Sequence, residues 1–362
     1  MSMADPLLFR PFELRGLELR NRLWAAPMCQ YSVPEEDGIP RDWHLQHLGG
    51  LARGGAALVM VEATAVVPEG RISPRDLGLW RDEQTPAFAR LAEIVHGHGA
   101  RIGVQLAHAG RKASTQPALP GFPSGSVPRG RGGWETVAPS AIAFPGLETP
   151  RELAGGEIPG IVRAFVAAAD RAVAAGFDVV EVHAAHGYLL HQFLSPLSNR
   201  RDDAHGGDLA GRARLTREVV RAIRRRHEAL PIVVRVSASE WVPGGFEVDE
   251  ATELADWLAA DGADLVDVSS GGNVADARIP VGPSYQVPLA ELVRQGELPV
   301  GAVGLITSAA QAEGILATGQ ADVVSLGRAL LANPHLPIHW AHELNAAAAE
   351  ELVPPAYHRA RF

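Results

Sequence analysis

The chain contains the stretch Val179-Val180-Glu181-Val182-His183-Ala184-Ala185-His186-Gly187-Tyr188. Its apolar beginning is typical of a buried strand that feeds a turn and a short helix. Residues three apart on a helix are neighbours, so a helical turn would return His186 to the side of His183. We therefore expect two imidazoles and the Tyr188 phenol to gather where a strand ends.

This cluster has a defined chemical use. Two hydrogen-bond donors on one oxygen, with a weak acid beside them, suit a reaction that polarises a carbonyl and delivers a proton. A purely structural role is the alternative, and for a single histidine it would be the better interpretation. Several such groups at a strand end of an α/β pattern favour a functional site.

The composition is that of a globular protein, with 46% hydrophobic and 21% charged residues. We expect no membrane span, since no apolar run approaches about 20 residues, and the first residues carry no secretion signal. One cysteine, Cys29, leaves no internal disulfide and no all-cysteine metal or iron–sulfur site. These features predict a cytoplasmic protein, and the net charge of −9 argues against nucleic-acid binding.

Short β-branched runs alternate with longer helical patterns along the whole chain, which is typical of repeated βα units. Eight units favour a single (β/α)8 TIM barrel over residues 1–362 rather than an open doubly wound sheet. The predicted strands are 23–28, 57–63, 102–106, 179–183, 232–237, 265–269, 300–303 and 323–326. The predicted helices are 45–53, 85–98, 160–175, 209–227, 251–260, 288–294 and 309–317.

Two segments depart from this rhythm. Residues 110–156, after the third strand, are rich in Pro, Gly and Ser but carry Trp134 and Phe144, and we expect a lid over the barrel mouth. Disorder is the alternative for this segment. Residues 335–362 are expected to form a C-terminal helix, extending to about 349, and an irregular tail.

The carboxyl ends of the predicted strands are polar, and barrel enzymes place their active sites there. Gly304 and Gly327 follow the last two strands and Arg328 begins a helix, which is the usual phosphate position of this architecture. Arg235, near the end of the fifth strand, needs an anionic partner if buried, and a bound cofactor would supply one.

Other site types fit less well. We find no dinucleotide fingerprint, P-loop, HExxH or GxSxG motif in a suitable context. His183, His186 and His191 could be zinc ligands of a barrel hydrolase. The accompanying HxH pattern and late aspartate of such enzymes are absent, so we expect no metal.

The residues of this chain resemble the Old Yellow Enzyme family of FMN-dependent ene-reductases, and in particular its thermophilic-like subclass. The resemblance covers nearly the whole chain, and the cysteine in PMCQYS indicates the subclass. A related branch with an iron–sulfur cluster, the dienoyl-CoA reductase type, is set aside because its cysteines are missing. The matching segments are NRLWAAPMCQYS (21–32), VEATAV (61–66), VQLAHAGRKA (104–113), the block 183–203, RVSASEW (235–241) and SLGRALLANP (325–334).

The resemblance implies non-covalent FMN, reduced by NAD(P)H, and a homodimer or homotetramer. It places Arg235 at the pyrimidine end of the flavin, with Gly327 and Arg328 at the phosphate. His183, His186 and Tyr31 would bind the substrate, and Tyr188 would donate the proton. Arg359 would reach the neighbouring subunit's site, with Arg361 as the alternative. The residues implied at the flavin ring are Ala26, Pro27, Met28, Cys29, Ala63 and Gln105.

The predicted function is that of an ene-reductase. NAD(P)H reduces bound FMN, which passes hydride to the β-carbon of an α,β-unsaturated carbonyl compound or related activated alkene, and Tyr188 protonates the α-carbon. The alternatives are an FMN-barrel oxidoreductase acting on hydroxy acids or dihydropyrimidines, and a catalytically silent flavin-binding protein. The first would need a different base constellation, and the polar strand ends disfavour the second.

Overall fold

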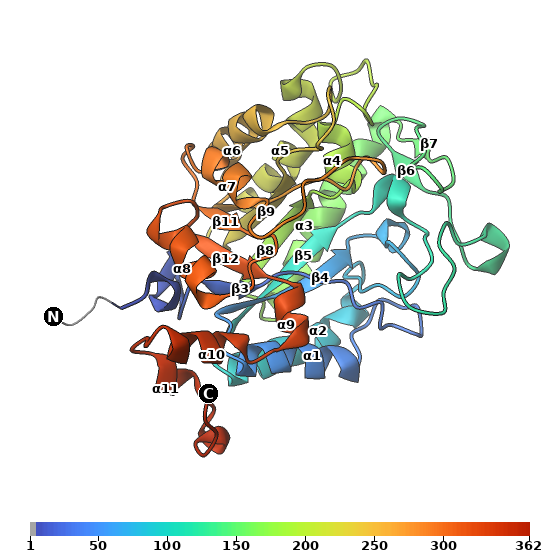
Figure 1. Cartoon of the computed structure of the whole chain (residues 1–362). Coiled ribbons are helices and arrows are strands. Elements are labelled where there is room, and N and C mark those ends of the chain that lie inside the picture. The colour runs from blue at the N-terminus through green and yellow to red at the C-terminus, as the bar shows by residue number, and fades with distance from the viewer. Residues whose placement is uncertain (1–4) are drawn as a thin grey trace.

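The protein is a closed barrel of eight parallel strands surrounded by helices (Figure 1). A computed structural model describes residues 5–362. Each barrel strand pairs with the next barrel strand along the chain, and β12 closes the ring against β3. The predicted barrel is therefore confirmed. Its strands are β3 (Leu23–Ala25), β4 (Leu58–Ala65), β5 (Arg101–Ala107), β8 (Val179–Ala184), β9 (Ile232–Ser237), β10 (Leu265–Ser269), β11 (Val300–Ala302) and β12 (Val323–Leu326).

The barrel strands are buried on both faces, as all eight residues of β4 show. Parallel strands are covered by helices outside and by packed side chains inside, which explains their apolar runs. The first strand differs from its predicted range of 23–28, because regular pairing ends at Ala25. The amide of Ala26 still donates to the Leu326 carbonyl at 3.0 Å, but Pro27 has no amide hydrogen to continue the ladder.

Amphipathic helices enclose the barrel. In α3 the buried residues Ile158, Ile161, Phe165, Ala168 and Ala172 recur at helical spacing and face the strands. The outer helices lie close to the predicted ranges. They are α1 (Asp42–Arg53), α2 (Thr85–Gly97), α3 (Ile158–Ala174), α5 (Leu209–Arg226), α6 (Val248–Asp261), α7 (Val287–Val293) and α8 (Ala309–Ala317), with the short α4 (Leu189–Leu194) directly after β8.

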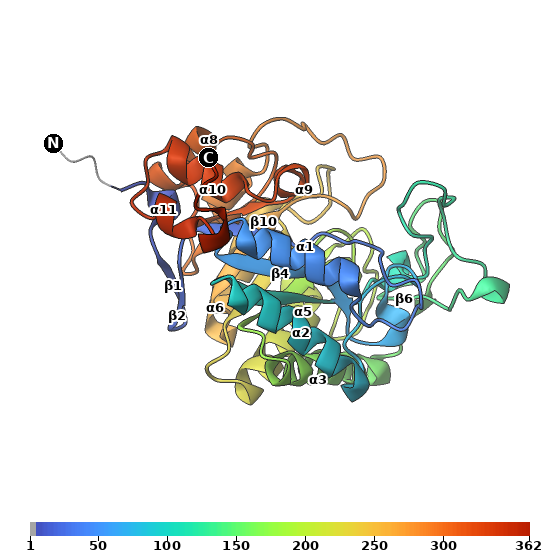
Figure 2. The same ribbon diagram turned by 90° about the horizontal axis from the view of Figure 1, so that it is seen from below.

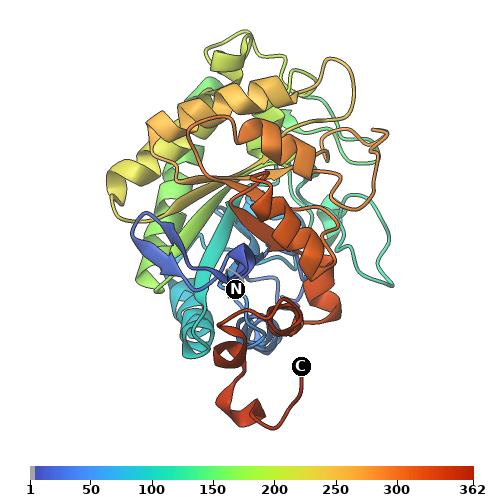
Figure 3. The same ribbon diagram turned by 60° about the vertical axis from the view of Figure 1, so that its left-hand side comes forward.

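A hairpin of β1 (Phe12–Leu14) and β2 (Leu17–Leu19) closes the amino-terminal end of the barrel. Figure 3 shows it, in blue, in front of the strands. Leu14 and Leu19 pack against side chains from the beginnings of the strands, among them Leu58 and Val179. This end is filled by apolar side chains, which leaves the carboxyl ends of the strands for a site.

The inserted segment 110–156 projects at the opposite end from this hairpin (Figure 2). It contains the paired strands β6 (Val137–Ala138) and β7 (Arg151–Glu152). The indole of Trp134 donates to the Glu69 carbonyl at 2.7 Å. The segment is thus tied to the barrel, although its action as a lid stays a prediction.

The chain ends in α9 (Arg328–Ala332), α10 (Leu336–Glu343) and α11 (Ala349–Leu352). The predicted continuous helix to residue 349 is wrong, because Asn345 adopts a left-handed conformation (φ 54°) that interrupts it. In the tail, the Phe362 ring stacks on His342 of α10, with 6.0 Å between ring centroids.

Candidate active site

Strand β8 and the turn after it bring three predicted residues together. The His183 ring centroid lies 5.1 Å from that of His186 and 5.1 Å from that of Tyr188. The predicted helical turn does not bring these side chains together, because helix α4 begins only at Leu189. Instead His186 has a left-handed backbone (φ 58°), and its amide donates to Ser237 Oγ at 2.9 Å.

The turn needs two glycines because it touches the loop after β10. A Cβ atom on Gly187 would lie 2.3 Å from the Gly272 carbonyl oxygen, and one on Gly272 would lie 2.6 Å from the His186 Cα. Both contacts are shorter than packed atoms allow. A side chain at either position would push the histidine pair apart from the β10 loop.

The two imidazoles have different partners. Nδ1 of His183 is buried without a hydrogen-bond partner among the described residues, whereas Nε2 of His186 lies 2.7 Å from Ser269 Oγ. Burial, and then the positive charge of Arg235, lowers the pKa of both rings well below the usual value. Both are therefore neutral near pH 7, and each ring carries one N–H and one nitrogen that can accept a hydrogen bond.

An apolar wall lies beside the histidines. Cys29, Tyr31 and Tyr188 pack on the small cluster that includes Ala63 and Ala107. Burial raises the pKa of the Tyr188 phenol well above its usual value, and Cys29 and Tyr31 add to this. The structure thus gathers Cys29, Tyr31, Ala63 and Tyr188, four predicted site residues that lie far apart in the sequence.

The loop after β3 is held by a carboxylate whose role sequence reasoning missed. Glu62 in β4 is buried, and it accepts a hydrogen bond from the backbone amide of Gln30. Its other oxygen lies 3.2 Å from Nε2 of His44 in α1. This pair fixes the chain next to the predicted ring residues Ala26, Pro27, Met28 and Cys29. A charged residue inside the apolar run LVMVEATA was the available signal.

Arg235 in β9 lies beside Asp267 in β10, with 3.1 Å between Nε and Oδ2. From the sequence we expected a bound cofactor to supply the anionic partner of Arg235, but Asp267 already supplies one. Gln105 donates to Glu181 at 2.6 Å in the same layer, and burial, then Asp267, raises the pKa of Glu181 to about 8. In the sequence, Asp267 and Glu181 each stand out only as one acidic residue within an apolar strand, with no sign of which residue each contacts.

A polar cavity of about 310 Å³ opens next to His186 and extends to the ends of β11 and β12. Gly304 has a left-handed backbone (φ 127°), and a Cβ there would lie 2.9 Å from Gln286 Nε2. A Cβ on Gly327 would lie 3.6 Å from the sulfur of Met28. The predicted phosphate residues Gly304, Gly327 and Arg328 therefore line one cavity. Ser269 and Ser270, at the polar end of the sixth strand, also line it, as do three residues that the sequence did not single out: Tyr285, Gln286 and Thr307.

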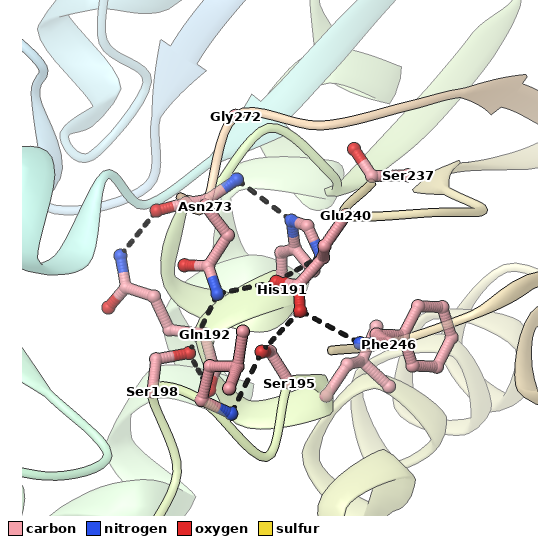
Figure 4. Close-up of polar contacts among 12 residues, drawn as sticks. His191, Gln192, Ser195, Ser198, Ser237, Glu240, Phe246, Gly272 and Asn273 are labelled. Carbon is pink, nitrogen blue, oxygen red and sulfur yellow. Dashed lines mark hydrogen bonds and ion pairs between the residues drawn. The ribbon is translucent and has the colours of Figure 1, made fainter. Parts of the chain in front are cut away.

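Behind the histidine turn, a buried polar network is centred on Glu240 (Figure 4). Its carboxylate accepts from Asn273 Nδ2 at 2.6 Å and from Ser195 Oγ at 2.8 Å. His191 points to this carboxylate, with 3.4 Å between Nε2 and Oε1, while its Nδ1 accepts from the Gly187 amide. His191 therefore supports the turn from behind. Residues 5–362 contain no group of three or more His, Cys, Asp or Glu side chains that could hold a metal ion.

Arg359 is not brought to the site of its own chain. It is exposed in the C-terminal tail, as is Arg361. The neighbouring site that we predicted for Arg359 would belong to another copy of the chain, so this role stays a prediction.

Within residues 5–362, no helix combines the length and the apolar character that a membrane span requires.

The comparisons identify the class of protein to which this barrel and its polar strand ends belong, the flavin-dependent oxidoreductases. The chain belongs to the NADH:flavin oxidoreductase / NADH oxidase family, the Old Yellow Enzyme family, whose model matches residues 7–347. It is 46% identical over 355 residues to an NADPH dehydrogenase of Listeria innocua, covering 98% of each chain. The enzyme is thus an FMN-dependent oxidoreductase that is reduced by NAD(P)H.

Two solved structures show the same fold. Morphinone reductase matches with a TM-score of 0.77 and 32% identity, over 96% of this chain and 92% of that one. A 2-naphthoyl-CoA reductase complex matches with a TM-score of 0.84 and 25% identity, over 96% of this chain. The present chain spans only 53% of that longer reductase.

The residues present fit FMN. Arg235 Nε lies 3.1 Å from Asp267 Oδ2 without hydrogen-bond geometry, and Asp267 Oδ1 is also buried without a hydrogen bond to the described residues, so this layer has unused polar capacity. The cavity lined by Gly304, Gly327 and Arg328 offers backbone approach and one cation, which suit a phosphate. Its hydroxyl and amide side chains suit a polyol chain.

Proposed function

We propose that this enzyme is an ene-reductase that uses NADPH to saturate activated alkenes, such as α,β-unsaturated carbonyl compounds. The observation that carries this proposal is the grouping of His183, His186 and Tyr188, with 5.1 Å between ring centroids in each pair that includes His183. The two structural neighbours described above are also reductases by name.

The histidine pair binds the substrate oxygen. Both rings are neutral, because burial and Arg235 lower the pKa of each. His183 has a buried ring nitrogen with no hydrogen-bond partner within residues 5–362. Ser269 contacts Nε2 of His186, which leaves its Nδ1 for a ligand. Donors fixed in this way stabilise the negative charge that develops on a carbonyl oxygen when the conjugated double bond is attacked.

Tyr188 supplies the proton. Its apolar surroundings keep the phenol protonated well above neutral pH, so the proton leaves only for a strongly basic acceptor such as the α-carbon of an enolate. Tyr31 faces the substrate from the loop after β3. FMN, held by the residues assigned below, would supply the hydride chemistry that links NADPH to the β-carbon.

We assign the cofactor contacts to the residues that surround these groups. Arg235 interacts with the pyrimidine end of FMN, paired with Asp267. Gly304, Gly327 and Arg328 hold the phosphate at the cavity. The proposed ring contacts are Ala26, Pro27, Met28, Cys29, Ala63 and Gln105.

We further propose a cytoplasmic homodimer or homotetramer in which Arg359 completes the neighbouring site, with segment 110–156 as its lid.

Anaerobic assays with NADPH and cyclohexenone test the function, with product analysis by NMR. We expect cyclohexanone, formed in equal amount to the NADPH consumed, and no consumption with cyclohexanone as acceptor. Formation of the allylic alcohol, or turnover of a hydroxy acid or a dihydropyrimidine instead, would replace this proposal by another flavin-barrel activity. If the flavin-loaded protein consumes no NADPH with any of these acceptors, the result would favour the alternative of a catalytically silent flavin-binding protein.

A further inference from the structure

Lys112 is the only lysine in the chain, although arginines are common throughout it. It ends the short 3-10 helix Gly110–Lys112, where the inserted segment begins. Arginine keeps its charge at every physiological pH, whereas lysine can lose it when buried. The chain therefore places a titratable cation at this one internal position.

The ammonium group is held by backbone oxygens and aromatic rings. Lys112 Nζ donates to the carbonyls of His186 and Gly272, each at 2.8 Å. It also lies 5.0 Å from the Tyr188 ring centroid and 4.9 Å from that of Phe144. No carboxylate among the described residues forms an ion pair with it. The cation thus lies against Tyr188 without a protein counterion.

We propose that Lys112 is a positioning residue that stabilises the negative charge left on Tyr188 when this phenol gives up its proton. The inference rests on the proposed function. The O–H bond of Tyr188 breaks, its electron pair stays on the phenol oxygen, and the proton forms a C–H bond at the substrate α-carbon. Water returns a proton to the phenolate before the next turnover.

The effect is electrostatic. The ammonium lies 5.0 Å from the centroid of the Tyr188 ring, over which the negative charge of a phenolate is partly delocalised, and a nearby opposite charge favours the ionised form of a group. The apolar wall around Tyr188 opposes ionisation, so the cation offsets part of the cost of leaving a phenolate there. The two carbonyl contacts fix Lys112 before the reaction, so little rearrangement is needed.

Other ionisable groups around Lys112 keep their charge states over the same pH range. Burial, with Arg111 adding, lowers the pKa of Lys112 to about 8. The groups facing it are Arg111 on its own turn, His183, His186, His191 and Tyr188 after β8, and Cys29 and Tyr31 beyond Tyr188. The pKa values of the histidines are lowered and those of Cys29 and both tyrosines are raised. Roughly between pH 7 and 10, Lys112 is therefore the member of this set that changes charge. Asp76 also acts on Tyr188, and burial raises the pKa of Asp76 to about 7, so its ionisation falls at the lower edge of this range and the Lys112 variants separate the two groups.

A single lysine allows a direct measurement. Holoenzyme carrying ε-¹³C-lysine gives one lysine resonance, whose shift against pH reports the ionisation of Lys112. We expect the rate of the enone half-reaction, followed by stopped flow, to fall as pH rises through the same midpoint. The rate of flavin reduction by NADPH is expected to lack this fall with rising pH, the alkaline limb of the pH profile, because that step needs no proton from Tyr188.

Variants separate charge from structure. Lys112→Met should slow the enone half-reaction about tenfold or more at pH 7 and remove the limb, whereas Lys112→Arg should remove the limb with less loss of rate. Retention of the limb in Lys112→Met, or a wild-type rate at pH 7, would overturn the proposal. Flavin content and circular dichroism show that the variants are folded.

An equilibrium readout keeps this test independent of ene-reduction. With 3,5-difluorotyrosine at position 188, the phenol ionises at lower pH and is followed by absorbance. We expect this ionisation to move to higher pH by one unit or more in Lys112→Met. An unchanged midpoint contradicts the role of Lys112 even if enones are reduced, and a shifted midpoint supports it even if they are not.

Discussion

Arg235 on β9 and Asp267 on β10 are paired neighbours in the strand register and form a buried ion pair, with 3.1 Å between Nε and Oδ2. Burial raises the pKa of Asp267 even though Arg235 lowers it, so the pair depends on both partners. The sequence led us to assign the counterion of Arg235 to a cofactor alone, but the protein supplies one itself.

Asp267→Asn should destabilise the FMN-free protein by about 3–5 kcal/mol, because it leaves a buried guanidinium uncompensated. Urea unfolding of the FMN-free protein measures this. Glu93→Gln is the matched control, since its ion pair with Arg90 is exposed and such pairs contribute about 0–1 kcal/mol. Equal losses of unfolding free energy in the two variants would show that the buried ion pair stabilises the protein no more than the exposed pair does.

Replacing both His183 and His186 by Ala should weaken binding of phenols and slow the enone half-reaction. Loss of one donor to a developing oxyanion typically costs on the order of 10² to 10³ in rate. Flavin titration with p-hydroxybenzaldehyde and stopped flow measure the two effects. FMN content should hardly change, so wild-type phenol affinity in the double variant would refute the oxygen-binding role.

Cys29 should act on the flavin as a neutral thiol and not as a nucleophile. Burial, then Asp76 and Glu62, raises the pKa of the thiol well above its usual value, so it stays protonated at pH 7 and reacts slowly there. Alkylation by iodoacetamide should accelerate only in strongly alkaline solution. Cys29→Ala should remain active with a shifted flavin potential, whereas an inactive variant that retains FMN would indicate an essential thiol.

Deleting residues 357–362 should raise the apparent KM for substrate or NADPH more than it lowers the melting temperature. Tyr357 and Phe362 are half-buried and contact His335 and His342 of their own chain at its edge, so little stability is lost, whereas the neighbouring site would lose Arg359. Mixed dimers of Arg359→Ala and Tyr188→Phe chains give the sharper test. The intact Arg359 on the Tyr188→Phe chain then completes the site that retains Tyr188. No recovered activity in verified mixed dimers, or a monomeric active enzyme, would exclude the shared site.

The barrel could be predicted because buried parallel strands show as apolar runs and outer helices as 3.6-residue patterns, as β4 and α3 illustrate. The meeting of Cys29, Tyr31, Ala63 and Tyr188 followed from strand ends sharing one face of the barrel.

Other features depend on contacts between distant segments, which one sequence does not display. The left-handed turn at His186 is set by Gly272, some 86 positions further on, and the loop after β3 by Glu62 and His44. Only the folded barrel shows which buried acid, Asp267, faces Arg235.

The central claim is that Tyr188 delivers the second hydrogen to an alkene whose oxygen is bound by the histidine pair. Stopped-flow measurement of both half-reactions in Tyr188→Phe tests it most directly. We predict nearly unchanged flavin reduction by NADPH and a reoxidation by enones slowed by about 10² to 10⁴, the usual contribution of a general acid. Equal slowing of both half-reactions, or an unchanged reoxidation rate, would contradict the account.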